Sequence, residues 1–135
     1  MKKYLLTLSI LTILFSFNAY SQADFTFDIT EHDFGSVEEK DDTLWYAFKF
    51  KNTGSEPLVI SNITTSCECT LADWVKKPVM PGQSGVIKAG YKYKGKSGNF
   101  NKNLTVIANT MPAVTYLTIK GVILEKKAAV VDKKK

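Results

Sequence analysis

The strongest constraint on the fold of this chain is a period-two alternation of apolar and polar residues along several short segments. Residues 44–51, for example, alternate Leu, Tyr, Phe and Phe with Trp, Ala, Lys and Lys. Alternate side chains of a strand point to opposite faces, so this pattern predicts half-buried β-strands. The expected strands cover residues 25–29, 44–51, 58–65, 87–94, 104–108 and 116–124. No window keeps the helical period of 3.6 for three turns.

Turn-forming residues separate these segments. The expected turns are residues 34–36, 52–57, 81–85, 94–98 and 111–112, which are rich in Gly, Pro, Asn and Ser. Six or seven short strands spaced by turns predict an all-β fold, namely a single-domain, immunoglobulin-like antiparallel β-sandwich. Both cysteines lie in one loop, so no disulfide joins the two expected sheets. Ten aromatic residues between Phe25 and Tyr93 can supply the core instead.

The first residues are typical of a secretory signal peptide. Lys2 and Lys3 precede an almost unbroken apolar run over residues 4–17, which is shorter than the roughly 20 residues of a membrane span. Small residues then allow cleavage before Gln22, which we prefer, or before Asp24. We therefore expect an exported protein, in the periplasm or at the cell surface or secreted. An uncleaved anchor is the less favoured alternative.

Cleavage before Gln22 leaves 114 residues, a length that suits one immunoglobulin-like domain. We expect the signal peptide at residues 1–21, the sandwich at residues 22–124 and a lysine-rich flexible tail at residues 125–135. The tail holds five lysines and two acids. Such a segment buries too little apolar surface to order itself.

Charge is segregated along the chain. Residues 24–42 hold eight acids and one lysine, whereas residues 75–124 hold eight lysines and no acid. The chain has no arginine, which argues against nucleic-acid binding. The segregation instead allows a basic face that meets phosphate, an acidic glycan or an acidic protein.

An ordered set of motifs resembles the domain-of-unknown-function 1573 family. The motifs are residues 32–37 (HDFGSV), 48–54 (FKFKNTG), 57–60 (PLVI), 65–70 (TSCECT) and 81–85 (PGQSG), followed by Tyr91, Gly98, Phe100, Lys102, Val106, Asn109, Leu117, Ile119 and Gly121. The resemblance implies an exported bacterial protein with an immunoglobulin-like fold, related to sandwich domains of the sperm-protein, ciliary and pilus-chaperone type. It implies no activity. Glu68 departs from the Gly that the family usually has between its two cysteines, where a positive φ would penalise a side chain.

The pair Cys67 and Cys69 is the feature with most chemical potential. In a straight strand the two Cα atoms lie about 6.5 Å apart, so a disulfide requires the chain to bend. An oxidising compartment and an even cysteine count favour pairing. The charge of Glu68 raises the pKa of a neighbouring thiol and so disfavours a reactive thiolate. We prefer a structural pair, bonded or packed, over thiol-redox function or metal binding.

Other chemistry has little support in the sequence. His32, Met80, Met111 and the cysteines could bind a soft metal, but nothing in their spacing brings them together, and His32 is better explained as a turn residue. The chain has no nucleophile elbow, metal-binding histidine pair or phosphate-binding loop. We expect no cofactor and no enzymatic activity.

Two segments are candidates for binding surfaces. Lys88, Lys92 and Lys94 are predicted to share one face of a strand, where we favour protection of a sheet edge, or simply solubility, over a binding role. Residues 71–80 are expected to form a loop, in which Trp74 closes one end of the core or, alternatively, anchors a partner together with Met80.

Asp42-Thr43-Leu44 matches a short acceptor pattern for bacterial O-glycosylation at Thr43. Taken together, the sequence predicts a non-enzymatic binding or accessory module of a bacterial cell-envelope assembly, with an envelope protein or protein complex as its partner. The alternative is a small thiol-redox or soft-metal-handling protein that uses Cys67 and Cys69.

Overall fold

A computed structural model describes residues 22–125, and this part of the chain contains eight strands and no helix. The strands are β1 (Phe25–Phe27), β2 (Glu31–Val37), β3 (Thr43–Asn52), β4 (Ile60–Thr65), β5 (Thr70–Trp74), β6 (Ser84–Lys92), β7 (Gly98–Ala108) and β8 (Val114–Ile123). The expected signal peptide and residues 126–135 of the expected tail lie outside the described residues. Within the described part, no helix is long and apolar enough to cross a membrane.

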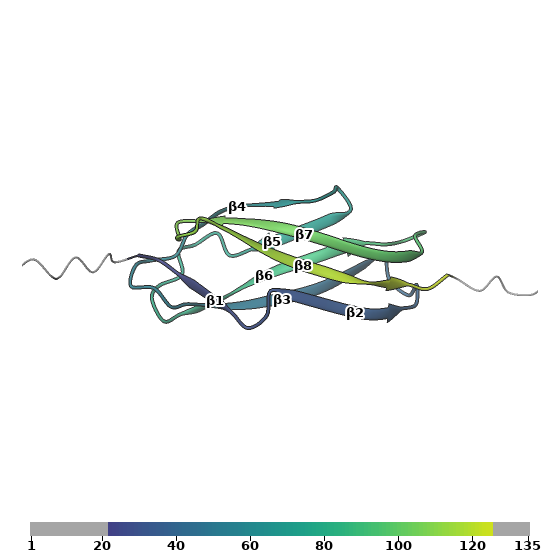
Figure 1. Cartoon of the computed structure of the whole chain (residues 1–135), viewed down its shortest axis with the longest axis horizontal. Helices are drawn as coiled ribbons and strands as arrows, with labels where there is room; N and C mark the ends of the chain where they lie inside the picture. Colours follow the sequence, from purple (N-terminus) through teal and green to yellow (C-terminus); the bar gives the residue numbers. More distant parts are fainter. Residues whose placement is uncertain (1–21, 126–135) are drawn as a thin grey trace, which may run out of the picture.

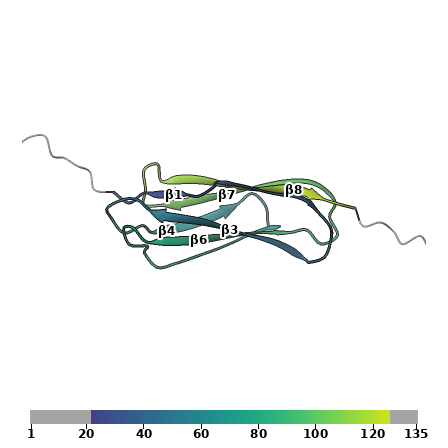
Figure 2. The same ribbon diagram turned by 90° about the horizontal axis from the view of Figure 1, so that it is seen from below.

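The strands form two four-stranded sheets that pack into an immunoglobulin-like sandwich, as the alternation predicts. One sheet has the order β1-β3-β6-β5 and the other has the order β2-β8-β7-β4. All neighbouring strands are antiparallel except β2 and β8, which are parallel. The sandwich is elongated in both views, and the described chain begins at one end of the long axis and ends at the other (Figure 1, Figure 2).

The core lies between the sheets and is built from the inward-facing positions of the alternating segments. Phe48 of β3, Ile87 of β6 and Leu117 of β8 have no exposed surface. Lys49 and Lys88, each next to a core residue in sequence, are exposed on the outer face. Burying an aromatic or aliphatic side chain of this size stabilises the fold by about 1.5–3 kcal/mol.

The buried polar side chain of Asn52 joins three backbone segments through hydrogen bonds. Its amide nitrogen donates to the carbonyl oxygens of Glu56 and Val79, each at 2.8 Å, and its amide oxygen accepts from the backbone N–H of Gly54 at 2.9 Å. The side chain is fully buried, so these bonds replace the water that it loses.

The prediction of a turn at residues 34–36 is wrong. His32, Phe34 and Gly35 belong to strand β2, and the register with β8 shifts between Asp33 and Ser36. Gly35 has a φ of 65°, a conformation that favours glycine, so it marks a β-bulge and not the end of a strand.

The prediction of a loop over residues 71–80 is also wrong in its first half. Residues 70–74 form β5, which pairs with β6 from Thr70↔Tyr91 to Trp74↔Ile87. This strand is short and only partly apolar, so the alternation along it is too brief to detect. At the N-terminus of the domain, β1 ends at Phe27, and Ile29 is exposed outside the strand.

Candidate interaction surfaces

Cys67 and Cys69 form a disulfide in the turn between β4 and β5, with their Cα atoms 5.3 Å apart. The chain bends as such a bond requires, because the backbone N–H of Thr70 donates to the carbonyl of Cys67 at 3.0 Å. Glu68 is accommodated without strain, since every described residue with a positive φ is a glycine. A bonded pair has no thiolate, and the structure therefore gives no support to a redox role.

The other potential soft-metal ligands lie apart from this disulfide. The backbone N–H of Lys92, at the end of β6, donates to the carbonyl of Cys69. The backbone N–H of Gln83, just before β6 begins, donates to the carbonyl of Met80. The disulfide and Met80 are therefore at opposite ends of the strand. Met80 and Met111 are exposed, and residues 22–125 hold no group of three or more His, Cys, Asp or Glu side chains that could bind a metal ion.

His32 is part of an aromatic cluster and not of a turn. Its ring stacks on Tyr46, with the centroids 3.6 Å apart and the planes 10° from parallel, and meets Phe34 edge to face. Burial in this cluster lowers the pKa of His32, and the charge of the neighbouring Asp33 opposes that shift.

The interpretation of the lysine row as edge protection is wrong, because β6 is an internal strand between β3 and β5. Lys88 and Lys92 are exposed on the outer face of this strand, and Lys88 lies opposite Asp73 of β5. Lys94 lies beyond the end of β6 and forms an ion pair with Asp42 at 3.0 Å. The hydrogen bond to Asp42 raises the pKa of Lys94.

Trp74 and Thr43 are both half-buried. Trp74 packs against the core, and its indole N–H donates to the carbonyl of Ile60 on β4 at 3.4 Å. Thr43 is half-buried at the start of β3, opposite Lys92. Met80, by contrast, is 54% exposed in the loop that leads to β6.

The exposed large hydrophobic side chain on the strands of the β1-β3-β6-β5 sheet is Trp45, a residue that the sequence pattern alone did not identify. It is 50% exposed on β3 and pairs in register with Gly90 of β6. A Cβ placed on Gly90 would lie 2.8–2.9 Å from three adjacent carbons of the indole. Nearly equal distances to three adjacent ring atoms mean that the ring covers Gly90 with its face. The opposite face of the indole is turned outward.

Lysines surround this tryptophan on the outer face of the sheet. The register places Lys88 and Lys92 on either side of Gly90 along β6, and Lys49 and Lys51 further along β3. We call this surface, consisting of Trp45, Lys49, Lys51, Lys88 and Lys92, the Trp45–lysine face. Asp73 is the one acid that the strands of this sheet carry on the same face.

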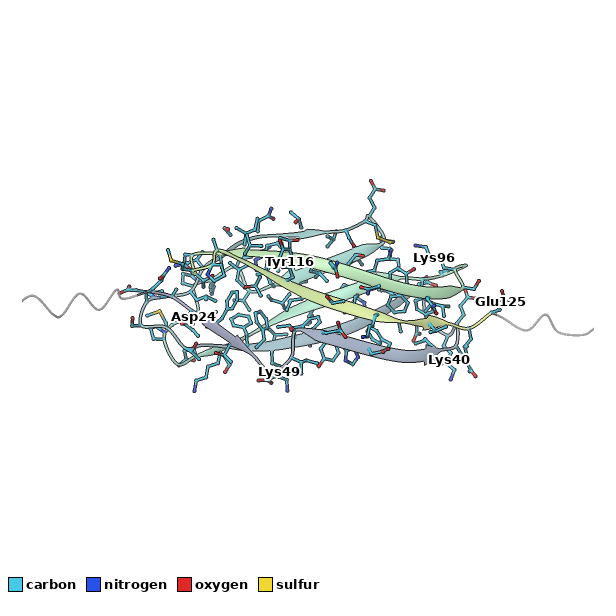
Figure 3. All side chains as sticks on the ribbon, in the orientation of Figure 1. Asp24, Lys40, Lys49, Lys96, Tyr116 and Glu125 are labelled. Atoms are coloured by element: carbon cyan, nitrogen blue, oxygen red, sulfur yellow. A yellow bond between two sulfur atoms is a disulfide. The ribbon has the colours of Figure 1, made fainter. Side chains whose placement is uncertain are left out.

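The other sheet has a different surface. Its exposed aromatic residue is Tyr116 of β8, 64% exposed, which stands on the opposite side of the sandwich from the Trp45–lysine face (Figure 3). Its register partner on β7 is Thr105, and Thr105 lies opposite Thr64 of β4. This part of the outer face is uncharged.

Each sheet also has two edge strands, and three of the four are protected against pairing with another chain. β1 has only three residues, between Asp24 and Asp28. β2 carries Glu31 and Asp33 and is interrupted by its bulge. β5 carries Asp73. Short length, charged side chains and bulges are the usual means by which proteins blunt sheet edges.

The fourth edge strand, β4, has no charged residue among its six, Ile-Ser-Asn-Ile-Thr-Thr. The uncharged stretch extends from Pro57 to Cys67 in the sequence. Strand β4 pairs with β7 alone, so its outer side faces no other strand of the sheet. We call residues Ile60–Thr65 the β4 edge.

Comparison with known proteins agrees with this architecture. The sequence pattern of the family described as "Protein of unknown function (DUF1573)" matches residues 25–123. The chain belongs to the DUF1573 family. No curated protein matches the DUF1573 chain.

Three solved structures with a similar fold are distant in sequence from this DUF1573 protein. A protein of unknown function from Porphyromonas gingivalis W83 is 18% identical with a TM-score of 0.66, over 80% of this chain and 50% of the other. The present chain thus spans about half the length of that protein. The ASH/PapD-like domain 7 of human CEP192 is 7% identical with a TM-score of 0.64, over 83% and 93% of the two chains. The YadV chaperone is 13% identical with a TM-score of 0.50, over 76% and 52%. At these identities the likeness concerns the fold.

Proposed function

We propose that this DUF1573 protein is an exported, non-enzymatic binding module of a bacterial cell-envelope assembly. In this proposal it binds an extended segment of a partner protein along the β4 edge. The observation that carries the proposal is that β4 is the one edge strand of the described sheets that combines six residues of length with a complete lack of charge.

An open strand edge is a template for strand addition. Its unpaired N–H and C=O groups can bind the backbone of an extended peptide, and the alternating side chains of that peptide supply specificity. Along β4, Ile60 and Ile63 are buried in the core, whereas Asn62 and Thr64 are exposed. The carbonyl of Ile60, at the start of β4, already accepts from the indole N–H of Trp74. An added strand would therefore pair with the backbone of residues 61–65, where it meets short polar side chains and no charge to desolvate.

Two further observations support the cellular setting. The N-terminal residues have the pattern of a secretory signal, and the Cys67–Cys69 disulfide fits an oxidising compartment such as the bacterial periplasm. The same disulfide gives no support to the thiol-redox alternative, because a bonded pair presents no reactive thiol.

The proposal is tested by site-specific photo-crosslinking in intact cells. A photoreactive amino acid at position 62 of β4 is expected to give a discrete adduct with a partner protein, whereas the same group at position 118 of the internal strand β8 is not. Mass spectrometry of the adduct should place the crosslink in an extended segment of the partner.

A matched pair of substitutions separates an edge effect from a general charge effect. Thr64→Lys puts a charge on the β4 edge, and Thr105→Lys puts the same charge on the same face of the neighbouring internal strand β7. We expect Thr64→Lys to abolish the adduct and Thr105→Lys to leave it. Equal crosslinking in both variants, or no adduct from position 62, contradicts binding at the β4 edge.

A further inference from the structure

The indole of Trp45 lies with one face against the sheet at Gly90. Gly90 has no side chain, and the ring occupies the space above its Cα, where any Cβ would fall 2.8 Å from the ring. The ring is thereby held flat against the sheet while the residue remains 50% exposed. A flat, pre-positioned aromatic surface is a stacking platform, because little side-chain freedom is lost when a ligand binds to it.

The charges around this platform are almost all positive. Lys88 and Lys92 lie two residues before and two residues after Gly90, so their Cα atoms are about 13 Å apart along an extended strand with the platform between them. Lys49 and Lys51 continue the positive charge along β3, where they line a shallow hollow together with Val86 and one acid, Asp28. Lys49 can be located at the rim of the sandwich in Figure 3.

We propose that the Trp45–lysine face binds an anionic polysaccharide that carries carboxylate groups. One sugar ring stacks on the open face of the indole, because the C–H bonds of the sugar carry partial positive charge and the face of an aromatic ring carries partial negative charge. Lys88 and Lys92 bind carboxylates of sugars on either side through charge-assisted hydrogen bonds.

Two other classes of ligand fit this geometry less well. A tryptophan that inserts into a membrane surface must project from the protein, whereas the Trp45 ring lies along the sheet. An acidic polypeptide would satisfy the lysines but has no regular ring to cover the indole. The site is on the β1-β3-β6-β5 sheet, whereas the β4 edge belongs to the other sheet. This inference therefore goes beyond the proposed function, and either one can fail without the other.

The experiment uses the chain from Gln22 to Lys135 with Trp74→Phe, so that Trp45 is the sole fluorophore of its type. Titration with alginate oligosaccharides is expected to change the Trp45 emission and to give saturable binding that weakens as NaCl is raised. Neutral dextran of similar length should not bind. Trp45→Thr, a residue suited to an exposed strand position, should weaken alginate binding at least about tenfold in calorimetry.

A charge-matched comparison tests the lysines. Lys88→Gln with Lys92→Gln should also weaken binding at least about tenfold, which corresponds to about 1.4 kcal/mol. Lys40→Gln with Lys77→Gln removes the same charge from exposed positions outside the strands of this sheet and should change affinity much less. Tyr116→Ala, on the opposite sheet, should leave it unchanged. Circular dichroism and thermal unfolding establish that each variant is folded.

Several results overturn the proposal. If both lysine pairs weaken binding equally, net charge and not the Trp45–lysine face determines affinity. If Trp45→Thr, when folded, binds alginate like the parent chain, the indole is not a platform. If polyaspartate or vesicles of anionic phospholipid change the Trp45 emission at lower concentration than alginate, the ligand is an acidic polypeptide or a membrane and not a polysaccharide.

Discussion

The indole of Trp45 lies face down on Gly90, its register partner across β3 and β6. Gly90 is buried although it points to the outer face of the sheet, because the indole shields it. The two residues therefore form a single surface feature, in which the glycine determines how the tryptophan is presented. Glycine is disfavoured within strands unless another group must approach closely, and here that group is an aromatic ring.

Gly90→Ala is expected to displace the Trp45 ring, because the new methyl group would lie 2.8 Å from it. In a chain that carries Trp74→Phe, the Trp45 emission should shift to longer wavelength as the ring moves into water. Stability should change by less than about 1 kcal/mol, since alanine also removes the entropic cost of glycine in a strand. Ser84→Ala, on the same face of β6, is the control. An unshifted emission spectrum for Gly90→Ala contradicts the close contact.

Replacing Cys67 and Cys69 with Ser is expected to lower stability only modestly. The bond closes a loop of three residues, for which loop-closure entropy accounts for about 1.6 kcal/mol, below the typical 2–4 kcal/mol of longer loops. Urea unfolding with and without reductant measures this difference. The photo-crosslink from position 62 should persist in the double variant. Its loss from a stable, folded variant would assign the cysteines a direct part in binding.

Stability is expected to fall as the pH is lowered from 7.5 to 5.5. Burial lowers the pKa of His32 below its ordinary value of 6.5, so the unfolded chain binds more protons than the folded chain between the two pKa values. The stabilisation is therefore present above the ordinary value and is lost as the pH falls through the pKa of the folded state. His32 is the only histidine in the sequence. Thermal midpoints of His32→Gln should depend less on pH over this interval, and identical pH profiles would rule out this assignment.

Under the proposed export, the mature chain is expected to begin at Gln22 and not at Asp24. Ala23 is 2% exposed and forms a bridge with Thr110, and the carbonyl of Gln22 accepts from the backbone N–H of Ser55 at 3.0 Å. Cleavage before Asp24 would remove these contacts. Intact-mass measurement of the protein from the cell envelope should give the chain from Gln22, with or without cyclisation of the terminal glutamine. A recombinant chain that starts at Asp24 should unfold at lower temperature, and a native mass that starts there contradicts the prediction.

The fold could be predicted because its main determinant is local. The alternation along residues 44–51 and 87–94 identifies the two central strands of one sheet, and hydrophobic burial then determines which face of each strand is inward. Strand β2 was missed because a glycine in the sequence does not show whether it lies in a turn or in a β-bulge. Gly35, with a φ of 65°, lies in a bulge. The distinction depends on the pairing of β2 with β8, which lies far away in sequence.

The candidate surfaces were harder to predict because they depend on strand order. The lysines at positions 88 and 92 are visible in the sequence, but their role depends on whether β6 is an edge strand or an internal strand. Strand β6 is internal because β5 pairs with it, and the sequence pattern did not predict β5. In the alternation of residues 44–51, Trp45 belongs to the same set of positions as Lys49 and Lys51, which point outward. This position could have identified Trp45 from the sequence, since a large aromatic residue at an outward position is exposed unless another element covers it. Its contact with Gly90 follows only from the register of β3 with β6.

The two ends of the described chain leave the sandwich at opposite ends of its long axis, as Asp24 and Glu125 show in Figure 3. Strands β2 and β8 run parallel beside each other between these ends. Tension applied to both ends acts on β8 directly and on β2 through β1, so it pulls β2 and β8 in opposite directions once β1 has separated from β3. Their hydrogen bonds are loaded together in shear, whereas those of a hairpin pulled from its open end break one after another. The parallel pair thus gives the domain mechanical resistance along the axis on which it would be stretched between two attached partners.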